Sequence, residues 1–332
     1  MADIFVKPFD EQRKPNGRFV KTGLAVLAVT VAIIGVCLWM DNRSAKATEP
    51  KPAVPENPVA QEKPAVPEKP AKTSVPAPAP VAPSAPSVGD VDYKAQQLFI
   101  RAQSLAAAGK LLEARDLLGE VAMTAAEENL KNNALRVQGR INVQLFLSPT
   151  PTPEKKSYVI QPGDSLDKIA RVNKTTVELI RKMNKMENNN IYPGGRLMMP
   201  AVPFVVNVSK SAKTVDLTMN GKLLKRYVVG LGVNGKTPLG TFRTVVHQTN
   251  PDWTPPGGGI IKFGDPKNLL GTRWMSIQDT TRPEIKGFGI HGTSARDSIG
   301  AETSNGCIRM LNEDVEELYL LIPRGTEVII SE

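Results

Sequence analysis

Residues 204–229, FVVNVSKSAKTVDLTMNGKLLKRYVV, contain three short runs in which apolar and polar side chains alternate. Alternation with a period of two is typical of a β-strand that buries one face, so we expect strands over residues 204–208, 214–219 and 223–229. Asn220-Gly221 joins the second run to the third, and this pair is a strong signal for a type I′ hairpin turn. The stretch therefore predicts antiparallel β-structure.

The same alternation continues toward the C-terminus, over residues 240–246, 287–291 and 327–330. Helical periodicity is confined to one place in this part of the chain, near residues 313–321. Residues 203–332 are therefore expected to form one mainly-β domain, antiparallel, with a single short helix.

Upstream of this domain, residues 90–147 have leucine and alanine at helical spacing. Gly109 divides the first part into a helix pair, and a third helix is expected from about residue 122 to 146. The segment AAAGKLLEARDLL, residues 106–118, resembles half of a tetratricopeptide-type repeat. Because such units normally need at least about three repeats to bury their faces, the pattern favours a short helical hairpin or spacer over a peptide-binding superhelix.

The N-terminal part predicts a membrane anchor followed by a spacer. Residues 23–40, GLAVLAVTVAIIGVCLWM, carry no charge and are long enough for a transmembrane helix. The basic residues of the tail 1–22 predict that the N-terminus lies in the cytoplasm and that the chain after residue 40 lies in the periplasm or faces the cell wall, as in a single-pass inner (cytoplasmic) membrane protein. The alternative is a cleaved signal peptide, since Ala45-Lys46-Ala47 resembles a cleavage site. Residues 41–89 form a proline-rich, extended linker.

Composition excludes several classes of function. The net charge is +9, but the basic residues are spread along the chain with only a mild excess in residues 154–201, so a nucleic-acid partner is not expected. Two cysteines and two histidines cannot make a disulfide framework, a four-thiolate zinc site or an iron–sulfur cluster. We expect no metal and no cofactor.

A compact βααβ module is predicted between residues 157 and 201. Residues 158–160 and 197–199 are expected strands, and a Pro-Gly-Asp turn precedes the first helix. Thr175, three residues before Glu178, is expected to open the second helix as a capping box.

These residues, beginning YVIQPGDSLDKIA at Tyr158 and ending IYPGGRLMMP at Pro200, resemble the LysM domain. The resemblance implies binding to glycans that contain N-acetylglucosamine, here the glycan strands of peptidoglycan. It places the binding site in the loops on either side of the helices, at Gly163, Asp164, Ser165, Leu166, Ile191 and Pro193.

Two residues of the C-terminal domain can carry chemistry, His291 and Cys307 in HGTSARDSIGAETSNGCIRM, residues 291–310. Cys307 is the only cysteine after the predicted membrane segment, so it is either a buried structural thiol or one kept for its reactivity. An imidazole nearby would depress the thiol pKa and later protonate a leaving amine. Gly292 lets backbone approach that imidazole closely, so its carbonyl can fix the tautomer.

The segments TPLGTF (237–242), NLLGTRWMSI (268–277) and SNGCIRM (304–310) closely resemble the L,D-transpeptidase catalytic domain. The resemblance implies that Cys307 is the nucleophile and His291 the general base. It assigns Ser304 to the active-site motif, and Gly306 with Cys307 to an oxyanion hole. Arg309 and Arg273 would meet stem carboxylates, with an ion pair that holds the turn as the alternative for Arg309. Trp274 would line the cleft or pack in the hydrophobic core.

One position departs from the family pattern, because Asn305 stands where a histidine is usual. Asn305 would then replace an imidazole in substrate contacts by uncharged hydrogen bonding. His247 is the other histidine of the chain, and a strand histidine is more often a packed or exposed bystander than a catalytic group.

The resemblance implies acyl transfer between peptidoglycan stem peptides through a cysteine thioester, a step in cell wall biogenesis and cell shape. The partners would be glycan strands and stem peptides, with the inner membrane contacted through residues 23–40. Two alternatives stay open: an L,D-carboxypeptidase that uses the same site with water, and a non-catalytic protein anchored to the wall through LysM.

Overall fold

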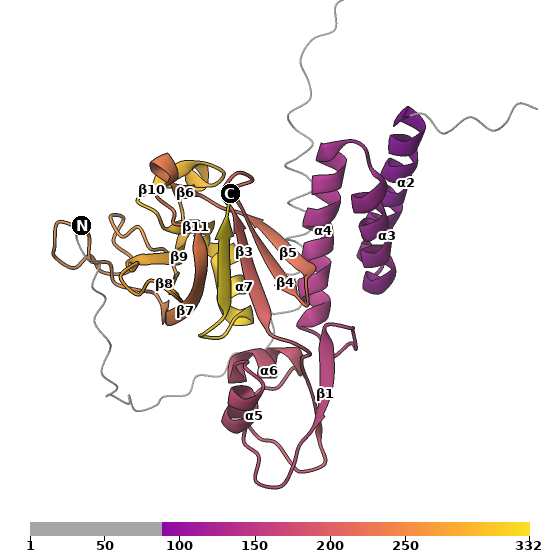
Figure 1. Ribbon diagram of the computed structural model, residues 1–332. Helices are drawn as coiled ribbons and strands as arrows, with labels where there is room; N and C mark the ends of the chain where they lie inside the picture. The colour runs from indigo at the N-terminus through magenta and orange to yellow at the C-terminus, as the bar shows by residue number, and fades with distance from the viewer. Residues whose placement is uncertain (1–87) are drawn as a thin grey trace, which may run out of the picture. The chain divides into compact units, whose positions relative to one another are not determined.

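The computed structural model describes residues 88–332 (Figure 1). The predicted cytoplasmic tail, the transmembrane helix at residues 23–40 and nearly all of the proline-rich linker lie outside the described residues. Within residues 88–332, no helix is both long and apolar enough to cross a membrane.

Three helices open the described part of the chain: α2 (Val88–Ala107), α3 (Leu111–Thr124) and α4 (Glu128–Phe146). Gly109 separates the first two at a φ of 77°, as its position in the sequence predicted. The third helix begins at Glu128 and not at residue 122. The break arises because Asp92 of α2 accepts hydrogen bonds from the backbone N–H groups of Ala126 and Glu127, at 2.8 and 3.1 Å.

The LysM-like module has the predicted order: β1 (Lys155–Val159), α5 (Leu166–Val172), α6 (Val177–Met183) and β2 (Arg196–Pro200), with the two strands antiparallel. Ser165 caps α5 by accepting a hydrogen bond from the Lys168 N–H at 3.2 Å. The expected cap of α6 was wrong by one residue. Thr176 is extended and accepts from the Leu179 N–H at 3.0 Å, so Thr176 caps the helix and Thr175 precedes it.

The C-terminal domain is built on an eight-stranded sheet in the order β11-β9-β8-β7-β12-β3-β4-β5 (Figure 1). Its strands are β3 (Phe204–Ser209), β4 (Thr214–Met219), β5 (Lys222–Val228), β7 (Gly240–Thr249), β8 (Arg273–Asp279), β9 (Phe288–Thr293), β11 (Ile308–Leu311) and β12 (Glu327–Ser331). Two very short strands, β6 (Leu231–Gly232) and β10 (Glu302–Ser304), pair separately. The helix α7 (Asn312–Leu321) packs on β8, β9 and β11.

The sheet is mixed, so the expectation of a purely antiparallel domain was wrong. The β11–β9 and β12–β3 pairs are parallel. Both arise because the chain returns over long connections: β11 follows the loop after β9, and α7 then carries the chain to β12 between β7 and β3. The predicted hairpin is present, since Asn220 and Gly221 have φ values of 49° and 72°, as a type I′ turn requires.

One hydrophobic core continues from the sheet into the upstream elements. Val143 and Phe146 of α4, and Leu179 and Met183 of α6, belong to the same buried cluster as the strands and α7. The Asn142 side-chain amide also donates a hydrogen bond to the Leu224 carbonyl of β5 at 2.9 Å. The helical segment is therefore docked on the β-domain, so the short helical hairpin or spacer expected over residues 90–147 packs as part of the fold.

Candidate active site

Neighbouring parallel strands bring His291 and Cys307 to one face of the sheet. His291 lies on β9, and Cys307 immediately precedes β11. The register pairs Arg309 with His291, which places Cys307 beside Gly289 two residues earlier. Because side chains alternate along a strand, Cys307, Arg309 and His291 share a face. The sequence placed these residues 16 positions apart, and the parallel pairing makes them neighbours.

The His291 imidazole is buried and held in one tautomer. Its Nδ1 lies 2.8 Å from the Gly292 carbonyl oxygen, so Nδ1 carries the proton and donates it, leaving the Nε2 lone pair free. The Trp274 ring packs against the imidazole with 5.9 Å between ring centroids. Burial, with the nearby Arg309 charge, lowers the pKa of His291 to about 4, against the Gly292 hydrogen bond, which raises it. At neutral pH this group is an uncharged base.

Burial is the main influence on the pKa of the Cys307 thiol. Cys307 keeps part of its surface exposed, and its Sγ lies 3.9 Å from the Gly287 carbonyl oxygen. Burial raises the pKa of the thiol to about 11, although a backbone hydrogen bond from Gly289 and the charge of Arg309 act in the opposite direction. The expectation that the imidazole depresses this pKa was wrong here. The pair is a neutral thiol with a neutral imidazole, which suits general-base activation during attack.

Ser304 holds the turn that presents Cys307. Its hydroxyl donates to the Cys307 carbonyl at 2.6 Å and accepts from the Gly306 N–H at 3.1 Å. Gly306 has a φ of 123°, and a Cβ there would lie 2.5 Å from a ring carbon of Phe288, so only glycine fits. The Gly306 N–H is thus already bonded and does not take the predicted oxyanion role. The Cys307 N–H has no acceptor within residues 88–332 and is the free backbone donor at the turn.

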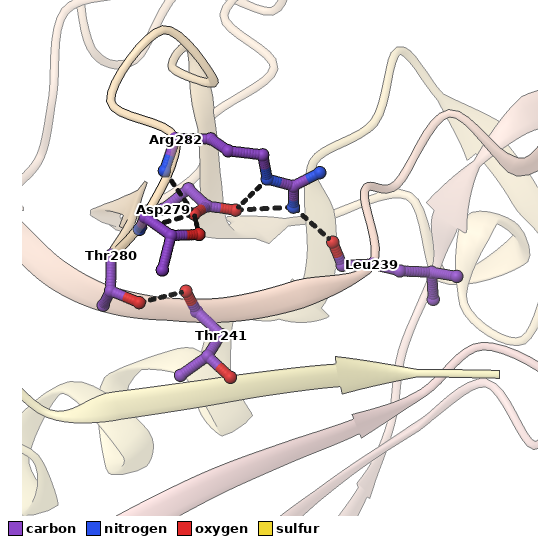
Figure 2. A network of polar contacts seen from close by, with 6 residues as sticks. Leu239, Thr241, Asp279, Thr280 and Arg282 are labelled. Atoms are coloured by element: carbon purple, nitrogen blue, oxygen red, sulfur yellow. Dashed lines mark hydrogen bonds and ion pairs between the residues drawn. The ribbon is translucent and has the colours of Figure 1, made fainter.

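The TPLGTF segment is fixed by an ion pair between a buried carboxylate, Asp279, and the partly exposed Arg282 (Figure 2). Arg282 donates to Asp279 through Nε and Nη2 at 3.1 and 2.7 Å, and to the Leu239 carbonyl at 2.9 Å. Arg282 and neighbouring backbone N–H groups hold the pKa of Asp279 well below its usual range. Thr237, at the start of the segment, accepts from the Gly232 N–H at 2.9 Å. Sequence reasoning missed Asp279 and Arg282; their i, i+3 spacing after a strand was the available signal.

Residues expected to bind substrate divide into two groups. Arg309 stays on the face of Cys307; its Nη1 donates to the Thr303 hydroxyl at 3.1 Å, and its buried Nε has no partner among the described residues. Asn305 is exposed beside the turn. Trp274 is only 3% exposed and fills core against His291.

Arg273 does not lie at the candidate site where it was expected, because its side chain points to the opposite face of β8 from Trp274. Its guanidinium lies 3.7 Å from Glu316 and 5.4 Å from the Tyr319 ring centre, both on α7. His247 lies on that same side, with 5.2 Å between its ring and that of Tyr319. Neither residue joins Cys307.

In the LysM-like module most predicted glycan residues are structural. Asp164 accepts from the Tyr158 hydroxyl at 2.7 Å and the Gln161 N–H at 2.9 Å, and Leu166 is buried. Ser165 is the cap of α5, and Ile191 packs partly on the core of the module. Gly163, with a φ of 78° and open space around it, and Pro193 stay on the surface. Tyr192, which sequence reasoning passed over, is 74% exposed beside Pro193.

Two parts of the chain match known protein families. Residues 203–330 match the YkuD family, described as the L,D-transpeptidase catalytic domain, and residues 158–200 match the LysM domain. A putative L,D-transpeptidase of Bacillus subtilis, YkuD, is 31% identical over 182 residues, which cover 53% of this chain and 98% of that protein. The chain therefore belongs to the L,D-transpeptidase family.

A second relative from Bacillus subtilis, the putative L,D-transpeptidase YqjB, is 36% identical over 143 residues, which cover 43% of this chain and 78% of that protein. Among solved structures, an L,D-transpeptidase from Mycobacterium smegmatis aligns over 42% of this chain and 64% of its own, with 19% identity and a TM-score of 0.33.

Proposed function

We propose that this protein is a peptidoglycan L,D-transpeptidase that cross-links stem peptides through a thioester on Cys307. The observation that carries the proposal is the His291 imidazole: its Nδ1–H is fixed on the Gly292 carbonyl, and its Nε2 is left as a neutral base on the face of Cys307. A histidine held in this way can take the thiol proton as the sulfur attacks.

In the first step the Cys307 sulfur attacks the carbonyl after the third residue of a tetrapeptide stem, and the thiol proton passes to His291 Nε2. The Cys307 N–H donates to the oxyanion of the tetrahedral intermediate. The carbon–nitrogen bond then breaks, and His291 returns the proton to the leaving amine of the terminal D-alanine.

In the second step a side-chain amine of another stem attacks the thioester. The amine gives a proton to His291, and the sulfur leaves and recovers that proton as the Cys307 thiol, so no net charge or proton is lost. Arg309 lies on the same face, and its buried Nε has no partner among the described residues, which supports a role in binding a stem carboxylate. The LysM module would hold the glycan strand and raise the local concentration of stems.

The test is incubation of the full chain with tetrapeptide-stem muropeptides, followed by mass spectrometry. We expect stem dimers from the wild type and from Lys222→Gln, an exposed change away from the site, and none from Cys307→Ala. Tripeptide stems without dimers would assign an L,D-carboxypeptidase. The absence of both products, with no acyl adduct on Cys307, would support the alternative of a non-catalytic protein that is anchored to the wall through LysM.

We also propose that residues 23–40 anchor the chain as a single-pass inner-membrane protein with the catalytic domain on the outer side. The support is the uncharged run of 18 residues preceded by basic residues. Retention in the membrane pellet after alkaline carbonate washing tests the anchor; release of a shortened protein would indicate a cleaved signal peptide.

A further inference from the structure

Two adjoining clefts, of about 580 and 400 Å³, lie where the loop after α5 meets the connection from α7 to β12. Both are lined by Thr175, Pro323 and Arg324, so the two clefts lie side by side. Neither is lined by Cys307 or His291, and both clefts are therefore separate from the candidate active site.

The larger cleft is strongly basic. Four cations line it, two from the LysM-like module, Arg171 and Lys174, and two from the β-domain, Arg243 and Arg324. We name this surface the cationic cleft. Its lining contains one carboxylate, Glu327, and the adjoining cleft adds Glu178.

None of the four cations forms an ion pair with any residue of the described range 88–332. Among the described residues, Arg243 has one hydrogen-bond partner, the Gly325 carbonyl at 3.2 Å. Other basic residues of the same domain are paired, such as Arg226 with Asp216 at 2.7 Å and Lys225 with Glu317. Gathering like charges without partners is unfavourable, and an anion bound between them would reverse that cost.

A buried hydroxyl in the same wall also has no partner. Thr175 is 8% exposed, lines both clefts, and its Oγ1 has no hydrogen-bond partner among the described residues. The neighbouring Thr176 uses its hydroxyl as the cap of α6, so of these two threonines Thr175 alone keeps a hydroxyl without a partner among the described residues. A buried polar group of this kind is unfavourable unless something bonds to it.

We propose that the cationic cleft binds the carboxylates of peptidoglycan stem peptides. The proposal rests on the proposed function, because it takes the substrate polymer from there. The loop at Gly163–Leu166 lies at the start of α5 and the cationic cleft at its end, about 10 Å along a helix of seven residues. A strand held by that loop therefore has stems within reach of the cleft. Guanidinium groups suit carboxylates because they bind them through paired hydrogen bonds.

The test measures binding of the full chain to insoluble peptidoglycan with intact stems and to the same glycan after an amidase has removed the stems. The cleft variant is Arg171→Gln, Lys174→Gln, Arg243→Gln and Arg324→Gln combined. The control variant removes the same charge from exposed lysines elsewhere that form no ion pair within the described chain: Lys156→Gln, Lys182→Gln, Lys185→Gln and Lys222→Gln. Folding of each is checked by its thermal unfolding midpoint.

We expect the cleft variant to bind intact peptidoglycan about tenfold more weakly than the wild type, and the control to change by less than about twofold. On stem-free glycan all three should bind alike, and the wild type should lose affinity for intact peptidoglycan as salt rises. Equal wild-type binding to both materials, or an equal loss in the control, would overturn the proposal. The proposal would also be overturned if wild-type binding fell when phosphate polymers were removed from the wall but did not fall when the stems were removed.

This outcome is distinguishable from failure of the proposed function. Binding is also measured with Cys307→Ala, which should retain the preference for intact stems. If muropeptide dimers never form but the preference for intact stems persists, the proposed binding cleft is supported and the proposed transpeptidase activity is wrong. If dimers form but the preference for intact stems is absent, the activity is supported and the proposed cleft is wrong.

Discussion

The pKa values of the two reactive side chains are shifted in opposite directions, and both shifts come from burial. The pKa of His291 falls to about 4 and that of Cys307 rises to about 11. His291 is therefore a usable base at any pH above about 4, and Cys307 stays a neutral thiol up to about pH 11. These shifts favour a neutral thiol beside a neutral imidazole over a thiolate–imidazolium pair.

The pH dependence of kcat/KM follows from these values. We expect activity to fall on the acid side only as pH drops toward 4, because His291 must become protonated to stop acting as a base. A profile of D-alanine release between pH 3.5 and 9 checks this. A half-maximal point between pH 6 and 7 would contradict it, because an ordinary imidazole would then control the rate.

Two adjacent threonines of the LysM-like module are expected to affect the free energy of unfolding in different ways when each is replaced by valine. Thr175 has a buried hydroxyl without a partner, whereas Thr176 caps α6. We expect Thr175→Val to leave the free energy of unfolding of the free protein unchanged or raise it by up to about 1 kcal/mol. Thr176→Val should lower it by about 1 kcal/mol, because the Leu179 N–H loses its acceptor. Urea unfolding of both variants is the measurement; a loss in Thr175→Val as large as in Thr176→Val would mean that the Thr175 hydroxyl is bonded.

Which residues could be predicted depended on how local their signal is. The contact between the His291 ring and the Gly292 carbonyl involves consecutive residues, and sequence reasoning identified it. The raised pKa of Cys307 depends on strands far along the chain, which no local pattern contains. Arg273 was misplaced because its side of β8 is set by the pairing of Trp274 with His291, so that Arg273 faces α7.

At the scale of elements, the hairpin between β4 and β5 shows the clearest agreement of sequence with structure. Its turn requires positive φ at two successive residues, and Asn220-Gly221 is the pair that tolerates this best. The parallel partners were not predictable in the same way. β11 has only four residues, and β12 joins β3 from the other end of the domain. The β12–β3 pairing depends on the path of α7, and the β11–β9 pairing on the loop between those strands, and neither depends on a pattern within the strands.

Substitution of Gly221 tests the turn. A Cβ at this position would meet nothing within 4 Å, so the cost of Gly221→Ala is conformational, at a φ of 72°. We expect a loss of about 1 kcal/mol in the free energy of unfolding. Gly221→Asn is the matched control and should lose less, because asparagine tolerates this conformation. Equal losses in chemical denaturation would show that the turn adopts another conformation.

At the scale of the whole described chain, α4 connects two hydrophobic cores. Ile141 and Leu145 belong to the core of the three helices, and Val143 and Phe146 to the core of the β-domain. Phe146 packs edge-on against Phe204 with 5.5 Å between ring centroids. The sequence of residues 90–147 shows that the helices have apolar faces but not which surface those faces pack against. For that reason a short helical hairpin or spacer was expected.

If α4 joins the two cores energetically, damage to the helical core must destabilise the β-domain. Leu118 is fully buried in the helical core and does not belong to the β-domain cluster, so Leu118→Ala should remove about 2–5 kcal/mol of stability. The reporter is the fluorescence of Trp274, buried on β8, in a background with Trp39→Phe and Trp253→Phe. We expect its urea midpoint to fall with Leu118→Ala and to stay in place with Met123→Ala, an exposed position on α3. A midpoint that Leu118→Ala leaves unchanged would show that the helices unfold on their own, since a cooperative unit must lose Trp274 burial and helix content together.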